Sequence, residues 1–595
     1  EAKEEKEEKE KEEGNFLKQK QQEEGKQAGN KESEKERPTS PGLFASISSS
    51  FASLPPFSHG EPTPQEEYPT IIIRTPYGRS LMDFVGQRFC ERGYIVLIQD
   101  CRGTGDSDGE FDPGFNETRD GKATLRWVRS QPWFQQCPKI GTWGPSYLGL
   151  VQLAVIENES DDKEAPPDAM VPIMTSSNFR NVIAPMGGGL HLSLFCRWHY
   201  ITNSQMKRRE KGNKENLLVK SLKEGQMIFQ KMDSKCNPAF HCPLAEVDKT
   251  ITEEETYLGT TLLNMCFSKN LQVKEEFWAR RNYVELLRKA QKMPNILLIA
   301  GWYDIFLDDQ ISDFLYMSSV EPENVRLIVG GWHHFDISAF SWGMSEGINH
   351  FEATLKGKTR HDKKETKKVK IYVMGKEKWI EMDQFPPRGD EIPSSLYFLA
   401  IEGTKKMLSS SPAVENNSSS KYIYDPSDPT PSIGGREFHP KEAGQRANNT
   451  LEKRHDILVF TTHALKNRVD LLGHVKVTLF MKFSTLSVDV FVRLCVVGAT
   501  VGRSKNMSDG YLRVYQQKGE EGRTKKVELF LSPCACTFHK GDKIRIQVAS
   551  GAHPRYHPNN GTGDPFSTDL EKSEVEIFHD EQNPSMIILN YQEEE

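Results

Sequence analysis

The sequence predicts an α/β domain that is interrupted by a helical insertion and followed by an all-β domain. Three observations predict this class: apolar runs alternate with helical stretches over residues 68–177, the strand signal fades over 178–292, and short alternating strands follow residue 369. The chain has 595 residues, several times the usual domain length, so two or three separate cores are expected.

The first segment is too polar to fold. Residues 1–37 are almost entirely Glu, Lys, Gln, Gly and Ser, and residues 38–64 are rich in Ser, Pro and Phe without periodicity. Such compositions cannot offset the entropy of ordering the chain. Residues 1–64 are therefore predicted to be a disordered leader and linker.

The α/β domain is expected over residues 65–177 and 293–355. Its apolar runs have the length of buried parallel strands, and the stretches between them carry helical patterning, as in βαβ units. The predicted strands are residues 70–74, 94–100, 139–143, 295–300 and 326–329, and the first helices are 81–92, 116–131 and 148–156.

The insertion and the second domain differ sharply in pattern. Residues 178–292 are predicted to form a helical cap, with helices over 214–232 and 274–289. Residues 369–595 are predicted to form a jelly-roll β-sandwich, because many short strands separated by turn residues are typical of that architecture. Its expected strands are 369–373, 396–400, 456–461, 474–483, 488–497, 526–531 and 543–548.

Composition excludes several classes of function. The net charge is −7 and the basic residues are scattered, so a nucleic-acid partner is not expected. The apolar runs are shorter than the roughly 18 residues of a membrane-spanning helix, which predicts no membrane span. The ten cysteines are spread singly, a usage that favours reduced thiols and a cytoplasmic protein. The oligomeric state is left open.

Ser146 is the predicted nucleophile. It lies in Gly144-Pro145-Ser146-Tyr147-Leu148-Gly149, after a predicted strand and before a predicted helix. This strand, tight turn and helix form the nucleophile elbow of an α/β-hydrolase, which pushes the serine hydroxyl out of the sheet. The segment reads GxSxxG, with Leu148 at the position that the commoner GxSxG form gives to glycine.

An acid and a base follow in the chain order of that fold. Asp304 comes just past the strand that ends at Ala300, and His334 just past the next strand. Their placement predicts a triad in which Asp304 orients His334 and His334 activates Ser146. Periodicity alone leaves His333 open as the base. A metal site at this histidine pair is discounted, because neighbouring side chains point apart and no zinc-protease spacing surrounds them.

Asp308 and Asp309, one turn beyond Asp304, have two interpretations. They could neutralise a substrate amine. Acidic residues in the first turn of a helix are also common because they stabilise its dipole, and this second interpretation is preferred.

Five ordered motifs of the α/β domain resemble the Xaa-Pro dipeptidyl-peptidase (S15) family, and most closely its cocaine-esterase-like branch of CocE/NonD hydrolases. The resemblance continues in the second domain through Tyr422 to Pro426, Gly434-Gly435, Ser508-Asp509-Gly510 and Pro554-Arg555-Tyr556. The five motifs are Arg74 to Arg79, Arg102 to Phe111, Gly144 to Gly149, Gly301-Trp302-Tyr303-Asp304 and Trp332-His333-His334.

The resemblance implies further roles. It makes His334 the base, gives the Tyr77 phenol and the Tyr147 backbone N–H to the oxyanion, and places Phe306 in the acyl pocket. It implies a serine hydrolase that cleaves ester or amide bonds, possible Xaa-Pro dipeptidyl bonds included, through an acyl-enzyme. The implied substrate is a small ester, amide or short peptide, and no cofactor or metal is implied.

Two departures from the family pattern keep an alternative open. The strands that normally precede the one at Ile71 are replaced by the polar leader, so that either the start is truncated or the sheet lacks an edge. Insertions at 405–421 and 436–454 alter the second domain. The alternative is a degenerate, non-catalytic hydrolase that binds carbohydrate or protein. The extra N-terminal domain of true Xaa-Pro dipeptidyl-peptidases is not recognisable, which favours an esterase or acylase.

Overall fold

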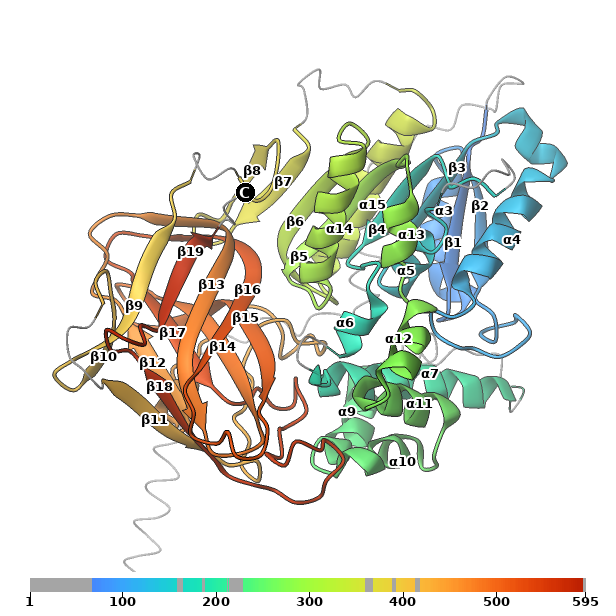
Figure 1. Cartoon of the computed structure of the whole chain (residues 1–595). Helices are drawn as coiled ribbons and strands as arrows, with labels where there is room; N and C mark the ends of the chain where they lie inside the picture. Colours follow the sequence, from blue (N-terminus) through green and yellow to red (C-terminus); the bar gives the residue numbers. More distant parts are fainter. Residues whose placement is uncertain are drawn as a thin grey trace, which may run out of the picture. The chain divides into compact units, whose positions relative to one another are not determined.

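The computed structural model of the chain describes residues 67–591, except 158–163, 185–187, 211, 213–227, 359–366, 388–391 and 413–417 (Figure 1). The predicted leader, residues 1–64, and most of the predicted helix 214–232 lie outside the described residues.

The first domain is built on a sheet of eight strands, with order β2-β1-β3-β4-β5-β6-β7-β8. Neighbouring strands from β2 to β7 are parallel, and all six residues of β1 are buried, as expected where helices cover both faces. The predicted α/β class is confirmed. The strands are β1 Thr70–Thr75, β2 Ile95–Asp100, β3 Ile140–Pro145, β4 Ala169–Ile173, β5 Asn295–Tyr303, β6 Val325–His333, β7 Val369–Val373 and β8 Lys378–Met382.

Three strands of this sheet, β4, β7 and β8, were not predicted as part of it. β4 was missed, since its five residues are few and include Pro172, yet it lies between β3 and β5 and is buried. Residues 369–373, predicted as the first strand of the second domain, form β7, which pairs in parallel with β6, and β8 pairs with β7 in antiparallel. β7 lies next to the edge strand and buries only alternate residues, which gives it the pattern of a sandwich strand.

Helices pack on this sheet: α3 on β2, α5 on β3 and β4, and α14 and α15 on β5 and β6. Their apolar faces and the strands enclose the core of the domain. The elements are η1 Arg79–Met82, α3 Asp83–Cys90, α4 Glu117–Arg129, η2 Pro132–Gln136, α5 Tyr147–Leu153, α14 Leu307–Val320 and α15 Ile337–Thr354.

Between β4 and β5 the described residues form helices. The predicted single helix over 274–289 is two helices, and in the turn between them buried Arg281 pairs with Asp112 at 2.7 Å. The helices of this cap are α6 Phe179–Ile183, α7 Leu192–Glu210, α9 Ile228–Ala239, η4 Leu244–Glu246, α10 Val247–Thr252, α11 Tyr257–Phe267, α12 Leu271–Ala279 and α13 Val284–Lys289.

The second domain is all-β, as predicted. Among its described residues, eleven strands form one hydrogen-bonded sheet that folds over a core of alternating apolar residues, and the strand pairs are antiparallel except β10 with β12. The elements are β9 Ser395–Glu402, β10 Lys405–Ser409, β11 Ser419–Tyr424, η5 Leu451–Lys453, β12 Ile457–Thr461, β13 Val469–Phe483, β14 Ser487–Val497, β15 Ser504–Tyr515, β16 Lys525–Phe538, β17 Lys543–Ala549, β18 Ser573–Phe578 and β19 Met586–Tyr591.

The second domain is bonded to the first beside the end of β5. The Tyr303 hydroxyl donates to the backbone oxygen of Asn506 at 3.1 Å, and the N–H of Met374 donates to Ala535 O at 3.0 Å. Because Tyr303 directly precedes Asp304, these bonds bring the second domain to the edge of the sheet where the predicted site lies.

Candidate active site

Ser146 is the single residue between β3 and α5. Its φ of 56° and ψ of −127° lie in a region that residues with a side chain rarely adopt. Its N–H donates to Ile173 O at 2.9 Å, which ties the turn to the end of β4. A strained residue between a strand and a helix is the geometry of a nucleophile elbow.

Two glycines allow this turn to close. A Cβ on Gly144 would lie 2.4 Å from Leu148 Cβ, and a Cβ on Gly149 would lie 2.4 Å from Thr175 Cγ2. Both approaches are too close for any residue with a side chain. The bulky Leu148, the departure from the commoner motif, is therefore accommodated by the missing side chain of Gly144.

Ser146, His334 and Asp304 are joined by hydrogen bonds at the carboxyl ends of the strands. His334 Nε2 lies 3.0 Å from Ser146 Oγ, and His334 Nδ1 lies 2.7 Å from Asp304 Oδ2. Asp304 is fully buried, and its other oxygen accepts the N–H of Phe306 at 2.9 Å. The geometry suits proton transfer from the serine to the histidine, with the carboxylate holding the ring.

The neighbouring His333, left open as the base, lies elsewhere. It is the last residue of β6 and pairs with Tyr303 of β5, and burial lowers the pKa of its imidazole below the usual range. The hydrogen bonds to Ser146 and Asp304 are made by His334. Adjacent side chains point apart at the end of the strand, as expected.

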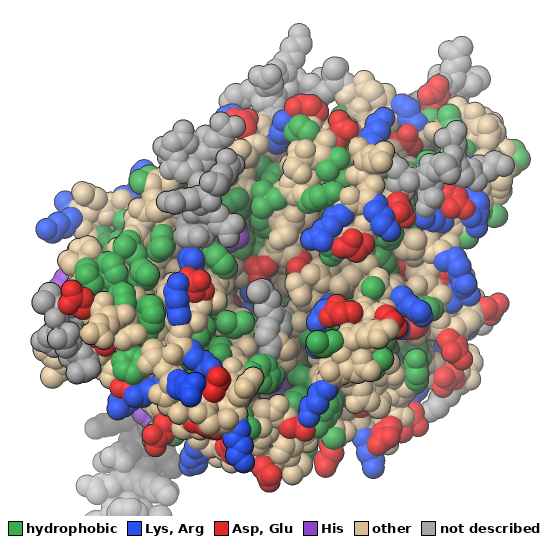
Figure 2. Space-filling model, viewed as in Figure 1, with side chains coloured by type: hydrophobic (Ala, Val, Ile, Leu, Met, Phe, Trp, Pro, Cys, Tyr) green, Lys and Arg blue, Asp and Glu red, His purple; other side chains and the backbone are tan. Residues whose placement is uncertain are grey.

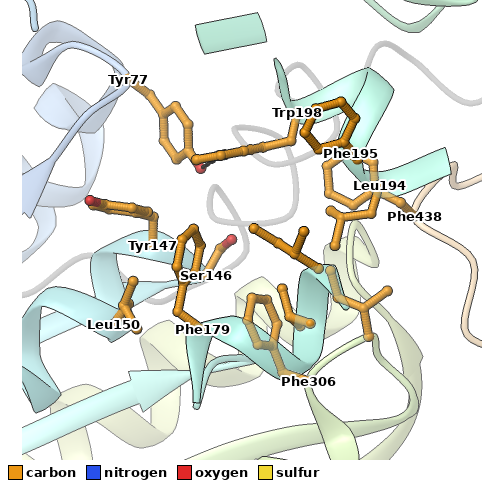
Figure 3. Close-up of a pocket in the computed structure, with 13 residues that line it drawn as sticks. Tyr77, Ser146, Tyr147, Leu150, Phe179, Leu194, Phe195, Trp198, Phe306 and Phe438 are labelled. Carbon is orange, nitrogen blue, oxygen red and sulfur yellow. Dashed lines mark hydrogen bonds between the residues drawn. The ribbon is translucent and has the colours of Figure 1, made fainter. Parts of the chain in front are cut away.

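Tyr77 and Tyr147, the residues predicted to hold an oxyanion, both lie beside Ser146 (Figure 3). The Tyr77 hydroxyl hydrogen-bonds the Ser146 side chain and accepts the indole N–H of Trp198 at 3.1 Å. Burial raises the pKa of Tyr77 to about 12, so the phenol keeps its proton at neutral pH. Tyr147 is the first residue of α5, where a backbone N–H has no acceptor within the helix.

The Tyr147 side chain is fixed by a buried polar network. Its hydroxyl donates to Glu117 Oε1 at 3.0 Å and accepts the N–H of Gly114 at 2.8 Å. Glu117 is in turn paired with Arg74 at 2.6 Å, and both of these side chains are buried. The backbone N–H of Tyr147 is thereby held in place beside Ser146.

A small apolar cavity of about 30 Å³ opens beside Ser146 (Figure 3). Its walls come from α5, from the cap helices α6 and α7, and from a loop of the second domain. No lining side chain carries a charge. The thirteen lining residues are Tyr77, Ser146, Tyr147, Leu150, Phe179, Val182, Ile183, Leu194, Phe195, Trp198, Ile305, Phe306 and Phe438.

Phe306 lines this cavity, as predicted, and its ring centre lies 5.6 Å from that of His334. The second domain adds Phe438, which was not predicted, at the same 5.6 Å from His334. Phe438 follows the Gly434-Gly435 motif, where a Cβ on Gly435 would lie 2.5 Å from Asp509 Oδ2. The Gly434-Gly435 motif thus lies in the same loop as Phe438, which the sequence analysis did not single out.

The acidic pair beyond Asp304 does not line the cavity. Asp308 forms an ion pair with Arg436 at 2.6 Å, and Asp309 accepts the side-chain amides of Asn178 at 3.1 Å and Asn181 at 3.0 Å. These contacts tie the second domain and α6 to the first turn of α14. Both acids are thus bonded to other parts of the protein.

No cluster of three His, Cys, Asp or Glu side chains suited to a metal ion occurs in the described part of the chain. Within the same residues, no helix is long and apolar enough to cross a membrane. On the face drawn in Figure 2, basic and acidic side chains are interspersed.

A strained serine, a hydrogen-bonded histidine and aspartate, and an adjoining cavity define the class of α/β-hydrolases that use serine. Residues 57–336 match the family model of the X-Pro dipeptidyl-peptidase (S15 family), and residues 361–588 match the X-Pro dipeptidyl-peptidase C-terminal non-catalytic domain. The chain belongs to this family and is a serine hydrolase, as its resemblance to the family implied.

Individual relatives are similar over most of their length. The cocaine esterase of Rhodococcus sp. (strain MB1 Bresler) is 25% identical over 564 residues, which cover 88% of this chain and 93% of the relative. Two solved structures share the fold, each covering 89% of this chain and 93% of the other: an aminopeptidase from a marine sediment Thaumarchaeota archaeon, with a TM-score of 0.72 and 17% identity, and an α-amino acid ester hydrolase, with 0.70 and 18%.

Proposed function

We propose that the protein hydrolyses esters of short, neutral acyl groups through an acyl-enzyme on Ser146. The observation that carries this proposal is the hydrogen-bonded line from Asp304 through His334 to Ser146, at the mouth of an uncharged cavity. In this line the serine can act as a nucleophile, the histidine as a general base, and the aspartate as the carboxylate that orients the histidine.

The first half of the reaction forms the acyl-enzyme. Ser146 Oγ attacks the carbonyl carbon while its proton passes to His334 Nε2, and the imidazolium is stabilised by Asp304. The oxyanion accepts hydrogen bonds from the Tyr77 hydroxyl and the Tyr147 N–H. His334 then gives its proton to the leaving oxygen as the carbon–oxygen bond breaks.

The second half repeats these steps with water. His334 takes a proton from a water molecule, whose oxygen attacks the acyl carbon. The second tetrahedral intermediate uses the same two donors, and it collapses when His334 returns the proton to Ser146 Oγ. A carboxylic acid leaves and the starting state is restored.

The cavity supports a short and neutral acyl group. The small volume of about 30 Å³ and the apolar lining favour a short acyl group such as acetyl. A free amine would be desolvated there without a carboxylate partner, since Asp308 and Asp309 lie outside the cavity and have other partners. These features favour an esterase over an enzyme that recognises a peptide N-terminus.

A fluorophosphonate probe tests the nucleophile. The intact protein is expected to be labelled on Ser146, and Ser146→Ala is expected to lose both labelling and esterase activity by several orders of magnitude. Ser484→Ala, in the second domain, is the matched control and should keep both. An unlabelled intact protein, or labelling that persists in Ser146→Ala, would contradict the proposal and favour the non-catalytic alternative.

A turnover panel tests the substrate class. We expect kcat/KM to be highest for p-nitrophenyl acetate, lower for p-nitrophenyl benzoate, and lowest for an α-amino acid ester and an Xaa-Pro anilide. The order follows from the size and neutrality of the cavity. Preference for the Xaa-Pro anilide would overturn the esterase assignment and leave the nucleophile unaffected.

A further inference from the structure

One hydrogen bond above the cavity joins the cap to the catalytic domain. The indole N–H of Trp198, in α7, donates to the hydroxyl of Tyr77 at 3.1 Å, and both side chains meet over Ser146 (Figure 3). We infer that Trp198 is a positioning residue, which directs the only proton of Tyr77 towards the oxyanion. The inference rests on the role given to Tyr77 in the proposed function.

The direction of this hydrogen bond follows from the two groups. An indole nitrogen can only donate, whereas a phenol has one proton to donate and lone pairs that accept. In this pair Tyr77 must therefore be the acceptor. Its proton remains for a second partner, and the Ser146 side chain is hydrogen-bonded to the same hydroxyl. When Ser146 attacks a carbonyl group, the oxyanion that forms on the substrate would lie on the side of Ser146 that faces the Tyr77 hydroxyl.

Trp198 is itself held rigidly. Its ring stacks on that of Tyr147, with centres 6.4 Å apart and planes at 19°, and meets Phe179 edge-on at 5.9 Å. Only 9% of its surface is exposed. One side chain thus contacts both predicted oxyanion residues: Tyr77 through its N–H, and Tyr147 through its ring face.

The electrostatics of Tyr77 agree with this role. Burial raises the pKa of its phenol to about 12, and the hydrogen bonds with Trp198 and Ser146 act in the opposite direction. The phenol therefore stays neutral and keeps its proton, while the indole dipole polarises it as a donor. Donors that are oriented before the reaction stabilise an oxyanion without a cost of reorganisation.

Trp198→Phe tests the inference, because it keeps an aromatic wall and removes the N–H. With p-nitrophenyl acetate we expect kcat to fall about fivefold to tenfold, the range of one lost hydrogen bond, and KM to stay within about twofold. Phe179→Leu is the matched control: it changes the wall and leaves the hydrogen bond, so KM should change more than kcat.

A double-mutant cycle with Tyr77→Phe separates positioning from packing. Trp198→Phe should have almost no effect on kcat when Tyr77 has already lost its hydroxyl, since Trp198 acts through that group. An equal fall in both backgrounds would overturn the inference and make Trp198 a wall only. If Trp198→Phe does not fold, Trp198→Leu takes its place in the cycle.

Failure of the proposed function would look different. If Ser146→Ala keeps its activity, the nucleophile is wrong, and if Tyr77→Phe alone keeps its full kcat, Tyr77 is not an oxyanion donor. If Tyr77→Phe loses about a hundredfold or more in kcat while Trp198→Phe loses nothing, only the inference about Trp198 fails.

Discussion

The floor of the candidate active site, formed by Ser146, Asp304 and His334, and the walls of the adjoining cavity are built largely from different parts of the molecule. Ser146, Asp304 and His334 all follow strands of one sheet and are held by hydrogen bonds. The walls come from the cap, from the second domain and from the loop after β5, and they line the cavity with apolar side chains such as Phe179, Phe438 and Phe306.

This difference separates reaction from selectivity. Parallel strands end at one edge of the sheet, so residues that follow neighbouring strands meet without any help from the inserted segments. The walls, in contrast, are set by packing, which tolerates changes of size. Changes in the floor should therefore affect the rate for every ester, while changes in the walls should affect which ester is preferred.

Asp304→Asn should have the largest effect, because it changes the floor. An asparagine at this place favours the wrong tautomer of His334, and loss of the analogous carboxylate lowers kcat about 10⁴-fold. Steady-state kinetics with acetyl and benzoyl esters should show the same loss for both. Asp308→Asn, which breaks the ion pair with Arg436 outside the cavity, is the control. A loss below about tenfold, or one confined to a single ester, would contradict the division between floor and walls.

Phe306→Ala should change the selectivity between acyl groups, because it removes a side chain that lines the cavity. The enlarged cavity is expected to raise kcat/KM for p-nitrophenyl benzoate relative to the acetate by about tenfold or more. Phe335→Ala is the control, since its ring also lies near His334, at 5.1 Å, but does not line the cavity. Equal losses for both esters in Phe306→Ala would mean that the ring serves only to support His334.

Tyr147→Phe distinguishes a backbone role from a side-chain role. The variant keeps the N–H that is proposed to hold the oxyanion, so kcat should stay within about threefold of the original value. It removes the hydroxyl that donates to Oε1 of buried Glu117, which keeps Arg74 as its partner, and leaves the N–H of Gly114 without this acceptor, which should cost about 1–3 kcal/mol in the free energy of unfolding. Kinetics and denaturant titration measure both. A hundredfold fall in kcat at unchanged stability would give the catalytic role to the phenol.

The residues of the floor could be predicted from the sequence better than those of the walls. The strands before Asp304 and His334 carry strong apolar runs, and the glycines around Ser146 are local signals. The class of fold and the family follow from these motifs. The roles given to the three residues stay predictions, now supported by their distances.

The rest depends on contacts between distant parts of the chain. Trp198 lies 121 residues from its partner Tyr77, in a helix that carries no motif, and Phe438 meets His334 from another domain. The pairing of β7 with β6 could not be predicted, because periodicity reports how a strand is buried and not which strand it pairs with. His333 and His334 are adjacent residues of the same type, and only the backbone conformation at the end of β6 determines that His334 is the one that contacts Ser146.

The smallest effect is expected at Asp313, which anchors the start of the wall helix α6. Its carboxylate accepts the N–H of Ser177 at 2.7 Å and the hydroxyl of Ser177 at 2.6 Å, and burial raises its pKa to about 7. Because the folded state keeps this proton at a pH where the unfolded chain has lost it, the resulting stabilisation is present below about pH 4 and is lost as the pH rises to about 7.

Asp313→Asn should remove this dependence on pH while keeping an oxygen for the N–H of Ser177. The apparent melting temperature is then expected to fall less between pH 5 and pH 8 than in the original protein, by a few degrees, with the acyl preference unchanged. Thermal unfolding at the two pH values measures the difference, and Asp106→Asn, at an ion pair with Arg79 in which both side chains are half-exposed, is the control that should keep the pH dependence of the original protein. A parallel fall in Asp313→Asn would show that this buried carboxyl does not titrate in that range. A changed preference between acetyl and benzoyl esters would show that Asp313 sets the shape of the wall as well as its stability.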